Sequence, residues 1–173
     1  MQSLISDLLA FSRVGRADAP LVEVALDDVA QTARDNLTSR IERTGARVEL
    51  GSLPVIEGDP VLLVAVFQNL VGNALKFHGD DPPVVHVSAE REDATWTITC
   101  SDEGIGIDPE YAERIFAIFQ RLHPKESYEG TGIGLALCRK IVEHHGGRIW
   151  LDTEVPTGAT FRFTLPARPE RSA

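Results

Sequence analysis

The chain has 173 residues and a formal net charge of −9, from 17 Lys plus Arg against 26 Asp plus Glu. This acidic balance argues against a nucleic-acid binder, which would have a clustered basic excess. The 43% hydrophobic and 25% charged content is that of a globular protein, and a chain of this length builds one core without a disulfide or a metal.

Cysteine usage and apolar run lengths bear on the compartment. Cys100 and Cys138 are too few and too far apart for a zinc ribbon, a CxxC redox pair or a secreted disulfide scaffold. The longest apolar run, residues 61–67, is far shorter than the roughly 20 residues of a membrane span, and the sequence shows no signal-peptide pattern. We therefore expect a reducing, cytoplasmic setting and no membrane insertion.

The first sixteen residues place Leu4, Leu8 and Phe11 on one stripe. This spacing predicts an amphipathic helix that ends near Gly15. After a short break at 17–20, the patterning predicts a strand at 21–25, a helix over 27–43 and a strand at 47–50.

Residues 60–77 form the most apolar segment, which predicts a helix that is buried on most sides. Asp59 and Pro60 suit its N-cap and first helical position. The remaining expected elements, in order, are strands at 84–90 and 95–101, helices over 109–119 and 133–145, and closing strands at 148–152 and 159–165. Helices and strands mix without strict alternation, so the predicted class is α+β.

Asn69, Asn73 and Lys76 are spaced to share one face of this apolar helix. Polar groups on a buried helix need partners, because an unsatisfied one costs roughly 1–3 kcal/mol. The partners are either a ligand or neighbouring loops, and this spacing alone does not separate the two.

Two glycine-containing segments follow. Asp102 stands at the end of a predicted strand, and Gly104 and Gly106 would let a flat ligand approach the backbone, although a tight strand-to-helix turn explains the same pattern. Further along, glycines at 130, 132 and 134 lead into a helix, where backbone N–H groups and the helix N-terminus suit an anion. A flexible hinge is the alternative there. The polar loop before that helix is long enough to form a lid.

The three sets occur here in a fixed order, and together they resemble the ATP-binding catalytic domain of sensor histidine kinases. This is a branch of the superfamily that includes gyrase B, mismatch-repair and heat-shock-chaperone ATPases. The motifs that match are the N box at 69–77, the first glycine box at 102–106, the F box at 115–122 and the second glycine box at 130–134. The resemblance covers roughly residues 21–166, and residues 119–150 look especially like bacterial phytochrome-type kinases.

The resemblance implies a two-layer α/β sandwich of the Bergerat type, with a mixed sheet of about five strands, three backing helices and a mobile ATP lid. It implies that Asp102 accepts a hydrogen bond from the adenine amine, that Asn73 ligates Mg²⁺, and that Asn69 and Lys76 serve the triphosphate as catalytic residues. The other implied nucleotide contacts are Gly104, Gly106, Arg121, Gly130, Thr131, Gly132, Gly134, Leu135 and Thr160. Phe116 and Phe119 would anchor the lid.

Position 69 distinguishes branches of the superfamily. The gyrase-type and chaperone ATPases have a glutamate there that activates water, whereas Asn69 cannot act as a general base. A histidine acceptor needs no such base, because its unperturbed pKa of about 6.5 leaves it mostly neutral at pH 7. The expected reaction is therefore phosphoryl transfer to histidine, driven by positioning and electrostatics.

None of the five histidines lies in the H-E/D-x-R/K-x-P context of a phosphoacceptor. Residues 1–16 resemble the tail of the second dimerisation helix, so we interpret the chain as a helix stub, a catalytic domain at 21–166 and a frayed tail at 167–173. The expected partners are the dimerisation and histidine-phosphotransfer domain of a homodimeric parent kinase and, through it, a response regulator. The alternatives are an anti-sigma-factor type serine kinase and a non-catalytic or phosphatase-biased regulatory module.

Overall fold

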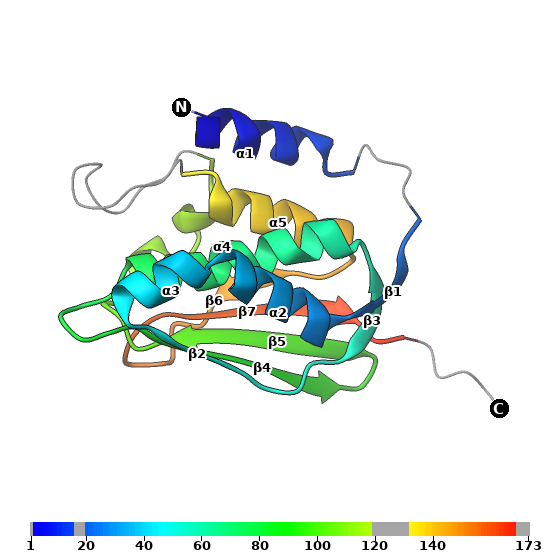
Figure 1. The fold of residues 1–173 in the computed structure, drawn as a ribbon. Helices are drawn as coiled ribbons and strands as arrows, with labels where there is room; N and C mark the ends of the chain where they lie inside the picture. Colours follow the sequence, from blue (N-terminus) through cyan, green and yellow to red (C-terminus); the bar gives the residue numbers. More distant parts are fainter. Residues whose placement is uncertain (1, 16–19, 119–131, 169–173) are drawn as a thin grey trace.

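The computed structural model describes residues 2–15, 20–118 and 132–168 (Figure 1). The helices are α1 (Gln2–Arg13), α2 (Leu26–Asn36), α3 (Thr38–Thr44), α4 (Pro60–Lys76) and α5 (Gly134–His144), with 3₁₀ turns η1 (Pro109–Tyr111) and η2 (Arg114–Phe116). The strands are β1 (Val22–Ala25), β2 (Arg47–Leu50), β3 (Val55–Gly58), β4 (Val84–Glu92), β5 (Thr95–Asp102), β6 (Ile149–Leu151) and β7 (Thr160–Pro166).

The main sheet has five strands in the order β2-β4-β5-β7-β6. Only β2 and β4 run parallel, and the other neighbouring pairs are antiparallel. Helices α2, α4 and α5 contact the sheet and lie on one side of it, as Figure 1 shows. The predicted α+β class, with a mixed five-stranded sheet backed by three helices, is confirmed.

Helix α4 is the centre of the core, as its composition predicts. The Asp59 carboxylate caps it by accepting from the N–H groups of Val61 and Leu62, and Pro60 occupies its first turn. Its buried residues are Leu63, Val66, Phe67, Leu70, Val71, Gly72, Ala74 and Leu75. It packs against α2 and α5 as well as the sheet, so most of its circumference is enclosed.

The single helix predicted over 27–43 is wrong, because the chain breaks there into α2 and α3 at Leu37. Leu37 has φ −103° and ψ 8°, and its N–H donates to Arg34 O at 3.0 Å. The Leu37 side chain is 4% exposed, whereas no residue of α3 is buried. The break therefore puts one leucine into the core while α3 continues along the surface.

Two other local predictions are corrected. The helix predicted over 109–119 is two 3₁₀ turns within its described part, because the adjacent residues Ile115 and Phe116 are both buried and do not follow a helical stripe. Strand β3 was not predicted, because it has only four residues and lies between two turn signals. Only Ile56 and Gly58 of the strand are buried. It pairs antiparallel with β1 in a separate two-stranded sheet.

The N-terminal helix α1 packs against α5. Lys140 Nζ donates to Phe11 O at 2.7 Å and lies 4.3 Å from the Phe11 ring centroid, while Val14 is buried. The side chains of Ile5, Leu8 and Leu9 remain 59%, 39% and 49% exposed. One side of α1 is thus docked and another presents apolar residues to the outside.

The far end of the chain is partly bonded to the domain. Ala167 N donates to Ala94 O at 2.8 Å, and Arg168 pairs with Glu23 at 2.9 Å. The rest of the predicted tail, residues 169–173, lies outside the described residues.

A buried histidine joins the two central helices. Asp59 N donates to Nε2 of His145 at 3.0 Å, and Nδ1 of the same ring lies 2.8 Å from Ile141 O. The ring must therefore be neutral with its proton on Nδ1, since a protonated Nε2 could not accept from Asp59 N. Burial lowers the pKa of His145, and the Ile141 carbonyl and the Asp59 charge oppose this shift while His144 adds to it.

We predict that His145 makes the fold sensitive to mild acid. Because the pKa of His145 is lower in the folded state than in the unfolded chain, its contribution is complete above about pH 6.5 and is lost as pH falls toward the folded pKa. The free energy of unfolding, measured with urea between pH 7.5 and 5, should therefore decrease less steeply in His145→Gln than in the parent. His144→Gln, which changes the exposed neighbour, is the control. Identical pH profiles for all three proteins would contradict the assignment.

Candidate functional site

The three polar residues predicted on α4 do share one face, and all are half-buried. Asn69 Nδ2 donates to Ala65 O at 2.7 Å, a partner within α4 itself rather than in a neighbouring loop. Lys76 Nζ lies 5.0 Å from the Phe77 ring centroid. The Asn73 carboxamide forms no hydrogen bond with residues 2–15, 20–118 or 132–168. Its donors and acceptor are therefore available toward this face.

Asp102 is held in one orientation by backbone N–H groups. Its Oδ1 accepts from Gly104 N at 2.8 Å and from Ala159 N at 3.2 Å. Its Oδ2 accepts from no residue in the described part of the chain, so it remains free to accept from a ligand. Burial raises the pKa of Asp102, and the two N–H bonds oppose this shift.

The loop after β5 runs tightly along the end of α4. Ile105 N donates to Phe77 O at 3.2 Å, and a Cβ at Gly104 would lie 2.3 Å from that same oxygen. Only glycine fits between the helix end and the Asp102 carboxylate. Gly104, which we expect from the sequence to let a flat ligand approach the backbone, is therefore required by this close backbone approach.

Two further residues at this site escaped the sequence analysis. Gly158 has a φ of +63°, and a Cβ there would lie 1.8 Å from Asp102 O. The next residue, Ala159, accepts a backbone bond from Asp102 N at 2.9 Å and supplies the second N–H to Oδ1. The only sequence signal was a glycine in the turn before the last strand, which any hairpin would share.

The second glycine segment meets α4 at Asn69, away from the helix end that lies beside Gly104. Gly132 has a φ of +75°, and Ile133, which is fully buried, fixes the start of α5. A Cβ at Gly134 would lie 2.6 Å from Asn69 Oδ1. Ile133, the N-cap residue of α5, forms no side-chain cap hydrogen bond, so no described side chain caps the first N–H groups of this helix, the groups that an anion site uses.

Helix α4 is thus the common wall of the site. Gly134 faces Asn69, and Gly104 faces the backbone oxygen of Phe77, as the close approaches of a Cβ at either glycine show. Phe77, the C-cap of α4, is eight residues after Asn69. At 1.5 Å per residue these two contacts are about 12 Å apart. Asn73 lies midway between them. A ligand with a flat polar group at one end and an anionic group at the other fits this spacing.

Other predicted site residues lie in different surroundings. Thr160 is 3% exposed and pairs in register with Ser101, next to Asp102. Leu135 is partly buried against the core. Arg121, Gly130 and Thr131 lie outside the described residues, as does Phe119. Phe116 is buried edge-on against Phe161, with ring centroids 6.2 Å apart.

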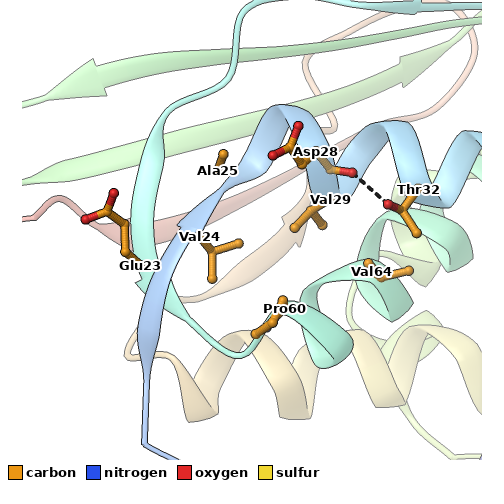
Figure 2. Close-up of a pocket in the computed structure, with 8 residues that line it drawn as sticks. All are labelled: Glu23, Val24, Ala25, Asp28, Val29, Thr32, Pro60 and Val64. Carbon is orange, nitrogen blue, oxygen red and sulfur yellow. Dashed lines mark hydrogen bonds between the residues drawn. The ribbon is translucent and has the colours of Figure 1, made fainter.

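A hollow of about 260 Å³ lies elsewhere, between β1, α2 and the start of α4 (Figure 2). Its lining residues are Glu23, Val24, Ala25, Asp28, Val29, Thr32, Pro60 and Val64. None of them is a predicted site residue, so this hollow is separate from the site on α4. Among the described residues no group of three His, Cys, Asp or Glu side chains could hold a metal, and no helix is both long and apolar enough to cross a membrane.

Known proteins share this architecture. The chain is 45% identical over 166 residues to the phytochrome-like protein Cph1 of Synechocystis sp., an alignment that covers 96% of this chain and 22% of Cph1. It therefore spans about a fifth of that relative's length. Its structure is similar to full-length ShkA in complex with AMPPNP, with a TM-score of 0.79 and 28% identity over 99% of this chain and 37% of ShkA.

A second solved structure is similar to this chain over almost its own full length. The mycobacterial sensor histidine kinase MprB matches with a TM-score of 0.75 and 26% identity, over 86% of this chain and 99% of that one. Residues 58–169, more than half of the chain, match one family along α4, both glycine segments and the last strand. The chain therefore belongs to the family of histidine kinase-, DNA gyrase B-, and HSP90-like ATPases, with the fold of histidine kinase catalytic domains.

Proposed function

We propose that this chain is the Mg-ATP-binding, phosphoryl-donating module of a two-component sensor histidine kinase. The feature that supports it most is the spacing of about 12 Å along α4. An oriented carboxylate lies beside one end, and a glycine-led helix N-terminus lies at the other. Asp102 Oδ2 would accept from the adenine amine, and the N–H groups at the start of α5 would bind phosphate oxygens.

The residues between these ends fit a magnesium ion that is shared with phosphates. Mg²⁺ takes oxygen ligands and keeps several waters, so one protein oxygen from Asn73 is enough when a triphosphate supplies others. The ion would neutralise charge on the phosphates. Asn69 and Lys76 lie on the same face and would orient and neutralise the transferred group.

The acceptor in this proposal is a histidine on a separate helical domain. The bond from the γ-phosphorus to the bridging oxygen breaks, a phosphorus–nitrogen bond forms, the imidazole loses its proton and ADP leaves. No carboxylate replaces Asn69, which favours histidine over water as the acceptor. Similarity to a phytochrome-like protein over 96% of the chain supports this branch over an anti-sigma-factor type serine kinase.

Helix α1 is, in this proposal, the tail of the dimerisation helix. Its exposed residues Ile5, Leu8 and Leu9 suit packing against partner helices of a homodimeric parent, while Val14 docks it on the catalytic domain. A response regulator would then receive the phosphoryl group from the complete kinase in the cytoplasm.

Nucleotide selectivity tests the Asp102 assignment. We expect calorimetry to show Mg²⁺-dependent binding of ATP and none of GTP, because guanine presents a carbonyl where adenine presents its amine. Asp102→Ala should weaken ATP binding roughly 10- to 150-fold, since removing a charged hydrogen-bond partner costs about 1.5–3 kcal/mol. Glu103→Ala, which removes the exposed neighbouring charge, is the control. Equal affinity for ATP and GTP would refute this role for Asp102.

Metal dependence tests Asn73. Asn73→Ala should reduce ATP affinity strongly with Mg²⁺ present and little with EDTA, because the lost oxygen acts through the ion. Gln68→Ala, a change on the same helix of a side chain bonded to Asn36, should leave the magnesium effect unchanged. Losses of equal size with and without Mg²⁺ would remove Asn73 from the metal site.

Phosphoryl transfer separates a kinase from a non-catalytic module. We expect no label on this chain incubated with γ-labelled ATP, and acid-labile label on a separately supplied dimerisation domain taken from the phytochrome-like relative. The same reaction with Asn73→Ala is the control for donor activity. ATP binding without transfer to any histidine-bearing domain would favour a regulatory module.

A further inference from the structure

The Asn69 carboxamide lies between its own helix, α4, and the first residue of α5. Its Nδ2 donates to Ala65 O at 2.7 Å within α4. Its Oδ1 faces the first residue of α5, where a Cβ at position 134 would stand 2.6 Å from Oδ1 and 3.4 Å from Cγ. Glycine at 134 leaves the space that this orientation of the amide occupies.

No backbone requirement explains a glycine at position 134. Gly134 is absent from the residues with positive φ, which include the nearby Gly132, and it begins a regular helix. Alanine would be preferred there by helix propensity. Within the described part of the chain, the three atoms nearest to the missing side chain all belong to Asn69. The requirement is therefore steric, and it points to one partner.

The start of α5 cannot easily move away to relieve such a contact. Ile133 is fully buried immediately before it, and Leu137 N donates to Ile133 O at 2.8 Å. One turn later, the Cys138 thiol contacts Val66 O at 3.8 Å and ties α5 to α4. A side chain at 134 would therefore displace the end of the flexible Asn69 side chain and leave the helices in place.

We propose that Gly134 is a positioning residue for Asn69. By lacking a side chain it lets the Asn69 carboxamide keep its bond to Ala65 and aim its remaining groups at the triphosphate end of the site. This inference rests on the proposed function for the role of Asn69, and it differs from a view in which Gly134 is only a backbone phosphate contact or a hinge. The two views differ in whether the effect of Gly134 depends on residue 69.

A double-mutant cycle tests this dependence, with Gly134→Ala, Asn69→Ala and the double variant compared with the parent. We expect Gly134→Ala to weaken Mg-ATP binding about tenfold in the parent and less than about twofold in the Asn69→Ala background. Affinity for AMP, measured by competition, should not change, since AMP lacks the phosphates that Asn69 serves. Gly79→Ala, whose Cβ would meet nothing within 4 Å, is the matched glycine control.

Thermal unfolding without nucleotide completes the test independently of binding. Gly134→Ala should lower Tm, by about 2–4 °C, in the parent and raise it in the Asn69→Ala background, where helix propensity acts without the clash. Additive losses of affinity, or the same Tm shift in both backgrounds, would overturn the positioning role. A parent chain that binds no ATP would refute the proposed function, while the Tm cycle would still decide whether Gly134 and Asn69 are coupled.

Discussion

Burial of helix α4 is the constraint on which the rest of the site depends. Eight of its seventeen residues are buried, and it contacts α2, α5 and two strands of the sheet. Because protein interiors are close-packed, a helix enclosed on so many sides has one position and one rotation. Its remaining polar face is therefore fixed as well, which places Asn69, Asn73 and Lys76 without help from a ligand.

Close backbone approaches fix the other parts of the site against this helix. Gly104 fits between Phe77 O and the Asp102 carboxylate, Gly158 fits against Asp102 O, and Gly134 fits against Asn69 Oδ1. Each glycine answers a different steric demand. The two that hold Asp102 adjoin backbone atoms that cannot yield, whereas Gly134 adjoins the end of a side chain that can.

The helix pair α4 and α5 also connects the site to the rest of the molecule. His145 ties the start of α4 to the end of α5, and Lys140 ties the middle of α5 to α1. The same α5 begins at the second glycine segment. Helix α5 thus connects the predicted phosphate end of the site, the buried His145 and the N-terminal helix α1. A displacement of α5 would therefore move all three.

Sequence patterns predicted the elements that have long periodic or alternating signals, which include α4, α5, β4 and β5, and the family motifs supplied the candidate residues of the site. The patterns did not predict the break at Leu37, the strand β3 or the 3₁₀ path of 109–116, because short segments follow tertiary burial more than local propensity.

The sequence by itself determined the α+β class, the buried helix with its polar face and the order of the two glycine segments. The local order of apolar, polar and glycine residues is sufficient to predict these features, because hydrophobic periodicity depends only on residues that are close in sequence. Only the tertiary structure decided that Ala159 and Gly158 hold Asp102, that His145 bonds Asp59, and that Gly134 lies against Asn69. These are contacts between residues 57, 86 and 65 positions apart, and packing of the whole core sets such distances.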